Sequence, residues 1–255
     1  MTASPEPLTV LVTGAGAPVT VVAHGFGASL AETRPLASGV PGTRVFLQAR
    51  GHGAAPAPER PGYAELAADL AAVADAHGAT QALGVSLGAA TLLHQLAATP
   101  ESYRRVVLFL PAALDRPRAD PAVRRVAGLA DALAASDTAA VEAAVRADLP
   151  EDLDGPAVTS YARSRAQFLL ASPGLPALLE ALAADVPVRD RSLLAAVTAD
   201  VLVLAQEDDP LHPVQVAREL VAVLPRARLV VFDRPGAVFR ERARLRSLIA
   251  GHLTP

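Results

Sequence analysis

The chain has 255 residues, which is enough for one α/β domain that carries a large insertion. Apolar residues make up 51% and charged residues 19%, so a sizeable core can form and disorder is not expected. The formal net charge of −3 comes from 23 basic and 26 acidic residues, and this balance gives no electrostatic reason to expect nucleic acid as a partner. The absence of cysteine excludes disulfides, thiolate catalysis and zinc sites built on cysteine.

Residues 1–33 carry no Lys or Arg, so the basic start of a secretory signal peptide is missing. Residues 78–100 form an uncharged run long enough to span a bilayer, but their Gly, Ser, Gln and His residues fit a strand, a turn and a helix better. We therefore expect a cytoplasmic protein with no membrane partner, acting on or binding a small molecule. We expect neither a cofactor nor a bound metal.

Short apolar runs of strand length recur along the chain, at residues 8–13, 19–23, 44–49, 81–85, 105–110, 201–205 and 228–232. The first two flank a Gly-rich turn and are predicted to form a hairpin. Several of the others are apolar throughout, which is typical of strands buried on both faces. Helical patterns lie between the runs, at residues 62–77, 87–98, 213–224 and 239–253. This alternation predicts a mostly parallel sheet flanked by helices, with right-handed crossovers.

The alternation stops between residues 115 and 199, where no strand pattern appears. Ala-rich helical segments separated by Pro and Gly fill this stretch, at residues 121–135, 138–147, 156–171 and 175–183. One crossover needs only one helix, so we interpret residues 115–199 as a helical cap rather than as part of the outer layer. The predicted domains are a core of residues 1–114 and 200–255 and a cap of residues 115–199.

The sharpest local motif is Gly84-Val85-Ser86-Leu87-Gly88, with a predicted strand before it and a predicted helix after it. The glycines let the backbone bend tightly between strand and helix, and the bend exposes the serine hydroxyl. The helix N-terminus supplies unpaired N–H groups for a developing oxyanion. The alternative is a serine in an ordinary strand-to-helix turn.

A second Gly-rich turn, His24-Gly25-Phe26-Gly27, follows the strand predicted at residues 19–23. Such a loop can present the Phe26 N–H to the same pocket as the Leu87 N–H. Two backbone donors aimed at one oxygen form an oxyanion hole. The other three residues of the turn, His24, Gly25 and Gly27, would shape the pocket; the alternative is a tight turn with no ligand.

With these residues in place, the chain resembles the α/β-hydrolase family. The matching segments are the His24–Gly27 turn, Arg50-Gly51-His52-Gly53, the turn at Ser86, and Gln206-Glu207-Asp208-Asp209-Pro210-Leu211-His212-Pro213. The resemblance implies an eight-stranded sheet and hydrolysis of an ester, thioester, amide or lactone through an acyl-enzyme. It makes Ser86 the nucleophile, the Phe26 and Leu87 amides the oxyanion hole, and Asp209 the acid, with Asp208 as its close rival.

One residue of the family pattern is missing. The family order is nucleophile, acid, then histidine, and the histidine position after the last strand is occupied here by Ala237. Serine attacks poorly unless an adjacent base takes its proton. His212, three residues after Asp209, is the first candidate for a substitute base and His24 is the second, and the alternative for each is a structural role. Carboxylates that could also serve are those of Glu207, Asp208 and Asp115.

Three functions follow from these residues. The first is a serine hydrolase acting on an ester, thioester or lactone of a small apolar substrate, with weak or atypical turnover because the usual histidine is absent. The second is a pocket that binds a hydrophobic ligand without turnover. The third is a non-hydrolytic cyclase or lyase that uses the oxyanion hole to polarise a carbonyl.

Overall fold

The computed structural model describes residues 8–117 and 120–255. Seven strands in this part of the chain form one sheet in the order β1-β3-β2-β4-β5-β6-β7. They are β1 (Thr9–Thr13), β2 (Val19–Ala23), β3 (Thr43–Gln48), β4 (Gln81–Val85), β5 (Arg105–Phe109), β6 (Asp200–Gln206) and β7 (Ala227–Phe232). All neighbouring pairs are parallel except β1 with β3. The α/β fold with a mostly parallel sheet is therefore confirmed, with seven strands in the described residues where the resemblance implied eight.

The hairpin predicted for the first two strands is wrong. β1 pairs antiparallel with β3, and β2 lies on the other side of β3, parallel to both β3 and β4. The burial of the two strands explains the difference. Four of the five β2 residues are buried, so β2 belongs inside the sheet with a neighbour on each side, whereas β1 keeps two exposed residues and forms the edge.

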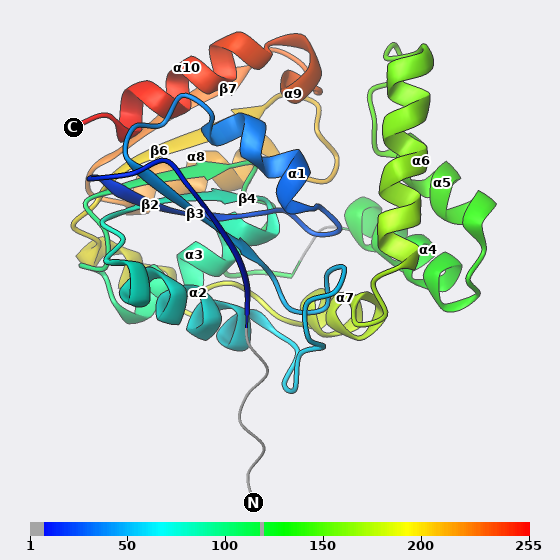
Figure 1. Cartoon of the computed structure of the whole chain (residues 1–255), viewed down its shortest axis with the longest axis horizontal. Coiled ribbons are helices and arrows are strands. Elements are labelled where there is room, and N and C mark those ends of the chain that lie inside the picture. Colours follow the sequence, from blue (N-terminus) through cyan, green and yellow to red (C-terminus); the bar gives the residue numbers. More distant parts are fainter. Residues whose placement is uncertain (1–7, 118–119) are drawn as a thin grey trace, which may run out of the picture.

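Helices cover both faces of the sheet (Figure 1). On one face, α2 (Tyr63–His77), α3 (Leu87–Ala98) and α8 (Val214–Val223) bury Leu70, Leu92 and Leu220 against the strands. On the other face lie α1 (Leu30–Thr33), the 3₁₀ helix η1 (Arg34–Ala37) and α10 (Arg242–Leu253), which buries Leu245 and Ile249. The helix predicted at residues 239–253 is two helices, because the backbone leaves helical geometry at Glu241, between α9 (Ala237–Arg240) and α10.

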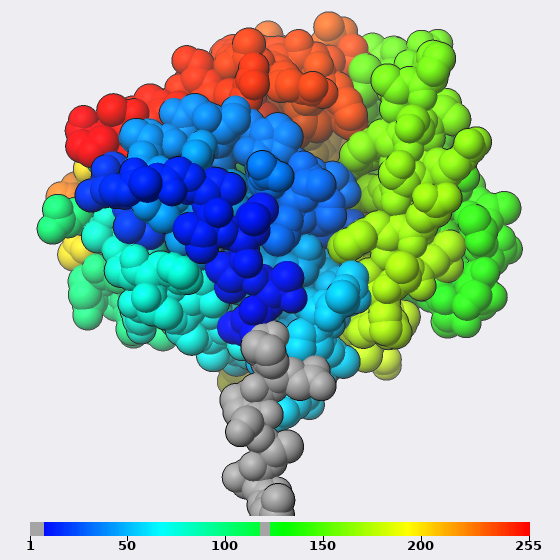
Figure 2. All heavy atoms as spheres, in the orientation of Figure 1, coloured from blue at the N-terminus to red at the C-terminus, as the bar shows by residue number. Residues whose placement is uncertain are grey.

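The strand-free stretch of the sequence forms four helices, which lie together on one side of the molecule (Figures 1 and 2). They are α4 (Asp120–Ala134), α5 (Thr138–Ala147), α6 (Pro156–Leu170) and α7 (Leu175–Ala184). Their buried residues, Val141, Leu169 and Leu178 among them, join those of α2 and α3 in a third apolar cluster. A further 3₁₀ helix, η2 (Arg191–Ala196), packs instead in the core beside α3 and α8. The division into core and cap domains stays a prediction.

In the part of the chain that the structure describes, no single helix is long and apolar enough to cross a membrane. Helices α6 and α7 meet the length and composition requirement only as a pair, and they are bent by 93° at the break between them.

Candidate active site

Ser86 lies at the turn between β4 and α3. Its backbone has φ 49° and ψ −103°, a left-handed conformation that residues with side chains rarely adopt and that costs roughly 1–3 kcal/mol. A Cβ on Gly84 would lie 2.5 Å from the Gly88 carbonyl oxygen, and a Cβ on Gly88 would lie 2.2 Å from the Ala23 carbonyl oxygen. The two glycines of the motif are therefore required by close backbone contacts on either side of the serine.

The Ser86 hydroxyl contacts a histidine that comes from the loop after β6. Ser86 Oγ lies 2.9 Å from His212 Nε2, and His212 Nδ1 lies 2.9 Å from Asp209 Oδ2. With Nδ1–H donated to the carboxylate, Nε2 is left to accept the serine proton. The structure thus brings together three side chains that the sequence had nominated, and it does so in the order nucleophile, acid, histidine.

The Asp209 carboxylate receives donors from four groups. The His212 ring and the Gln206 side-chain amide bind Oδ2 at 2.9 and 2.6 Å, and the backbone N–H groups of Leu211 and His212 bind Oδ1 at 2.9 and 3.1 Å. Burial acts to raise the pKa of Asp209, but the hydrogen bond and charge of His212, together with the other donors, hold it well below the ordinary value. Asp209 is therefore ionised, and it orients His212 from within the same loop. Asp208, its rival in the sequence, makes none of these contacts to His212.

The position where the family pattern places histidine is filled by buried Ala237, at the start of α9. Gln206 joins this position to the acid. Its Oε1 accepts the backbone N–H groups of Gly236 and Ala237 at 3.1 and 3.2 Å, while its Nε2 donates to Asp209. Sequence reasoning gave Gln206 no role, because nothing in a single sequence indicates that a strand-end amide bridges two loops.

The turn after β2 runs beside Ser86, since a Cβ on Gly25 would lie 3.5 Å from the Ser86 Cβ. The Gly25 carbonyl accepts His24 Nδ1–H at 2.8 Å and the Ala28 N–H at 3.1 Å. Because a trans peptide points its C=O and N–H in opposite directions, the Phe26 N–H points away from His24. Leu87 is the first residue of α3, where a backbone N–H has no acceptor within its own helix. Both amides belong to residues that line the cavity around Ser86.

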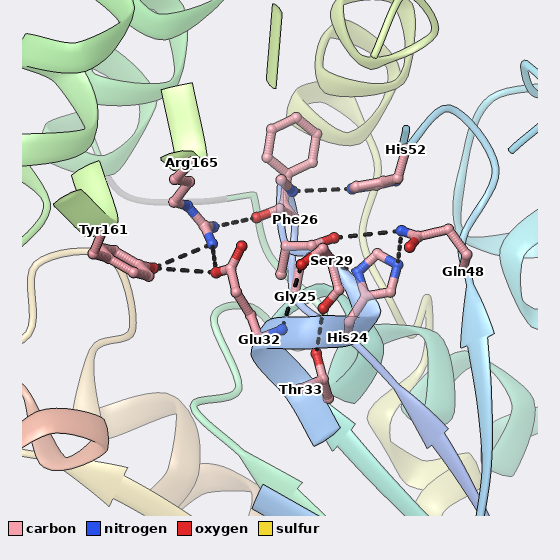
Figure 3. A network of polar contacts seen from close by, with 12 residues as sticks. His24, Gly25, Phe26, Ser29, Glu32, Thr33, Gln48, His52, Tyr161 and Arg165 are labelled. Carbon is pink, nitrogen blue, oxygen red and sulfur yellow. Dashed lines mark hydrogen bonds and ion pairs between the residues drawn. The ribbon is translucent and has the colours of Figure 1, made fainter. Parts of the chain in front are cut away.

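His24 and His52 are buried beneath this turn and hold it in place (Figure 3). His24 Nε2 lies 2.8 Å from Gln48 Nε2 and accepts the Ala49 N–H at 3.0 Å, while His52 Nε2 accepts the Gly27 N–H at 3.0 Å. Burial lowers the pKa of His24 to about 4 and the pKa of His52 to about 3, so both rings are neutral near pH 7. Since both nitrogens of His24 are engaged in this network, the geometry does not support His24 as a base for Ser86.

Two of the remaining candidate bases, Glu207 and Asp115, have other partners. Glu207 pairs with Arg218 at 2.7 Å, and Asp115 pairs with Arg191 at 2.5 Å. Neither residue lines the cavity around Ser86, whereas Asp208 does. Among the described residues, no group of three or more His, Cys, Asp or Glu side chains is arranged to hold a metal ion.

A cavity of about 790 Å³ lies over Ser86 between the sheet edge and the four helices α4–α7. Its wall is mostly apolar, with Leu36, Phe109, Leu129, Leu169, Leu182 and Phe239 among the lining residues. Four of the charged groups on the wall form two ion pairs, Arg165 with Glu32 at 2.6 Å and Arg125 with Asp148 at 3.3 Å. The site combines a serine, a base and two nearby amides with room for an apolar ligand.

These features agree with the known proteins that the chain is similar to. The family model described as "alpha/beta hydrolase fold" matches residues 18–239, so the chain belongs to the α/β-hydrolase family. No protein with a curated description matches the sequence.

Solved structures of three hydrolases resemble the chain over almost its whole length. An esterase from Exiguobacterium antarcticum has a TM-score of 0.81 at 18% identity and covers 96% of this chain and 95% of its own. An enol-lactonase from Burkholderia xenovorans LB400 has a TM-score of 0.81 at 21% identity, with 97% and 96% covered. A 2-hydroxy-6-oxo-6-phenylhexa-2,4-dienoate hydrolase from Rhodococcus sp. strain RHA1 has a TM-score of 0.78 at 21% identity, with 96% and 94% covered. At these identities the likeness shows the fold alone.

The buried histidines predict how stability depends on pH. The folded-state pKa of His24 is lowered to about 4 from 6.5, so protonation favours the unfolded chain. Neutral His24 makes its full contribution to the free energy of unfolding above pH 6.5. This contribution is lost as the pH falls towards 4, and the loss is roughly 3 kcal/mol for a shift of this size. Urea unfolding between pH 7.5 and 4.5 should give a shallower pH dependence for His24→Gln than for the wild-type protein. The exposed His77→Gln is the control, and parallel curves for all three proteins would contradict the prediction.

Proposed function

We propose that this protein is a serine hydrolase that cleaves an ester, thioester or lactone bond of an apolar substrate, with Ser86 as nucleophile, His212 as base and Asp209 as the acid that orients it. The observation that carries the proposal is the hydrogen-bonded chain from Ser86 Oγ to His212 Nε2 and from His212 Nδ1 to Asp209 Oδ2, at 2.9 Å for each step. The absence of the family histidine at position 237 was the reason to consider a ligand-binding pocket or a non-hydrolytic enzyme, and the contact of His212 with Ser86 supports the hydrolase instead.

The reaction follows from these atoms. Ser86 Oγ forms a bond to the substrate carbonyl carbon while its proton passes to His212 Nε2, and the carbonyl π electrons move onto the oxygen. The Phe26 and Leu87 N–H groups stabilise this oxyanion. When the carbonyl re-forms, the bond to the alkoxide or thiolate leaving group breaks and His212 returns its proton to that group. A water molecule activated by His212 then attacks the acyl-enzyme, which releases the carboxylic acid product and restores Ser86.

His212 is suited to this role although it does not follow the last strand. It lies three residues after Asp209, between Pro210 and Pro213, and His212 N–H binds the same carboxylate as its ring does. Proline fixes φ, so the two flanking prolines reduce the freedom of the loop. A short, rigid loop that carries both acid and base supports a preorganised pair, which lowers the cost of reaching the reactive geometry.

The cavity favours an uncharged acyl group. Its wall is mostly apolar, and the guanidinium of Arg165 is already paired with Glu32, so a substrate carboxylate entering there would compete with an existing ion pair. A cavity of about 790 Å³ also leaves room for more than a two-carbon acyl group. Neutral esters or lactones with an acyl group longer than acetyl are therefore the substrates to try first.

A fluorophosphonate probe tests the nucleophile and its base. We expect labelling at Ser86 in the wild-type protein, none in Ser86→Ala, and a labelling rate lowered about 10³-fold or more in His212→Ala, because serine then lacks a proton acceptor. Mass spectrometry of the adduct locates the label. The exposed His77→Ala should label at the wild-type rate. A folded wild-type protein that is not labelled, or an unchanged rate in His212→Ala, would overturn the proposal.

The position of the family histidine gives a second test. We expect Ala237→His not to raise the kcat for p-nitrophenyl butyrate, because the Asp209 oxygen is already bound by His212 and Gln206. Ala237→Asn is the matched control for placing a polar side chain in this buried position. A gain of orders of magnitude in Ala237→His alone would mean that His212 does not serve as the base.

We expect Gln206 to affect kcat through its hydrogen bond to the Asp209 carboxylate. Gln206→Leu removes the 2.6 Å donor from the carboxylate and leaves the Gly236 and Ala237 N–H groups without their acceptor. We expect kcat to fall about 10-fold or more with a smaller change in KM, since the loss acts on the base rather than on substrate contacts. Arg218→Leu, which removes an exposed ion pair to neighbouring Glu207, is the control. Equal kcat values for wild type and Gln206→Leu would contradict the expectation.

A further inference from the structure

Arg165 of α6 reaches from the helical side of the cavity to the turn that carries Phe26 (Figure 3). Its Nη2 donates to the Phe26 carbonyl oxygen at 2.7 Å, and its Nη1 donates to Glu32 Oε2 at 2.6 Å. Tyr161, one helical turn earlier on α6, donates its hydroxyl to the same Glu32 oxygen at 3.3 Å. One guanidinium therefore links α6 both to the turn after β2 and to the helix that follows it.

The peptide bond between Phe26 and Gly27 is held from both sides. Arg165 binds its carbonyl oxygen, and His52 Nε2 accepts its N–H at 3.0 Å. Gly27 has φ +65°, and a Cβ there would lie 2.5 Å from Leu169 Cδ2, so α6 packs directly against this bond. The conformation of the turn thus depends on contacts from α6 as well as from the sheet side.

The peptide bond before Phe26 is fixed from the sheet side, where His24 and the Ala28 N–H bind the Gly25 carbonyl. Two rigid peptide planes therefore meet at the Phe26 Cα, and the Phe26 N–H lies in the first of them. Because the two planes share that atom, a shift of the second plane moves the N–H end of the first. The sheet-side residues fix one plane, and Arg165 with His52 fixes the other. Loss of the Arg165 contact would release the carbonyl end of the second plane.

We propose that Arg165 is a positioning residue for the oxyanion hole: by binding the Phe26 carbonyl from α6, it aligns the Phe26 N–H on the reacting oxygen. This inference rests on the proposed function, because it assigns Arg165 to the chemistry of Ser86. It also makes the oxyanion hole dependent on the seating of α6. Arg165 does not serve here as an anchor for a substrate carboxylate, since Glu32 already pairs with it.

The test compares Arg165→Lys and Arg165→Met with the wild-type protein. Lysine keeps a charge beside Glu32 but lacks the planar fork that reaches two acceptors at once. For p-nitrophenyl butyrate we expect kcat to fall 10- to 100-fold in both variants, with KM within about 3-fold, because a misdirected donor acts on the transition state. Arg163→Met is the matched control, since it removes an exposed arginine from the same helix and leaves the Phe26 contact intact.

A second readout separates positioning from simple loosening of the cap. Butyl boronic acid, which forms a tetrahedral adduct on serine, should lose affinity in parallel with kcat, whereas the affinity for butyramide, a ground-state analogue, should stay within about 3-fold. Equal losses for both ligands would overturn the inference. So would a KM increase confined to acidic esters, which would make Arg165 a carboxylate anchor.

Failure of this inference is distinguishable from failure of the proposed function. If the wild-type protein is labelled at Ser86 and turns over, and the Arg165 variants keep the wild-type kcat, then the inference alone is wrong. If the wild-type protein is not labelled, the hydrolase proposal fails and this inference fails with it. Melting temperatures of all variants check that each protein is folded at the assay temperature.

Discussion

The hydrogen bond between the Ser86 hydroxyl and the His212 ring is the contact on which the functional interpretation depends. It requires a serine held in a left-handed conformation, which in turn requires the glycines that allow backbone to approach backbone at Gly84 and Gly88. A serine in relaxed backbone geometry would not need the close backbone approach at Gly84 or the one at Gly88. The strain at Ser86 and its contact with a ring that also binds Asp209 therefore belong to one arrangement.

In the proposed hydrolase one loop carries both the acid and the base, and this changes what the rest of the sheet edge has to do. Where the histidine follows the last strand, the triad forms only if two loops hold fixed positions relative to one another. Here Asp209 and His212 lie on the same loop. Gln206 still ties the loops together, since it binds both Asp209 and the N–H of Ala237. Under the proposed function position 237 has no catalytic role, and it holds a small buried alanine.

The sequence was enough to predict the parallel sheet and the flanking helices, because strand and helix periods are local signals. It also named Ser86, Asp209 and His212 among its candidates, and the structure brings these three side chains into contact. It did not predict that β1 pairs with β3, since pairing depends on which strands the whole chain buries. It also left His212 as one option among several. The choice rests on a distance between residues far apart in the chain, which no local pattern encodes. Gln206 and Arg165 went unrecognised for the same reason.

In the family pattern the segment after the last strand supplies the histidine. Here the segment after β7 contacts α6 and the link that precedes it. Phe239 packs edge-to-face on Tyr161 with ring centroids 5.4 Å apart, and Arg240 forms an ion pair with Asp152 in the link between α5 and α6. These contacts join the segment after β7 to α6 and to the link before it. They lie on the side of the cavity where Arg165 of α6 binds the Phe26 carbonyl. Phe239 also lines the cavity, so this segment helps to seat α6 and to shape the space above Ser86. Under the proposed function, substrate selection and the alignment of the oxyanion hole would both depend on this one helix.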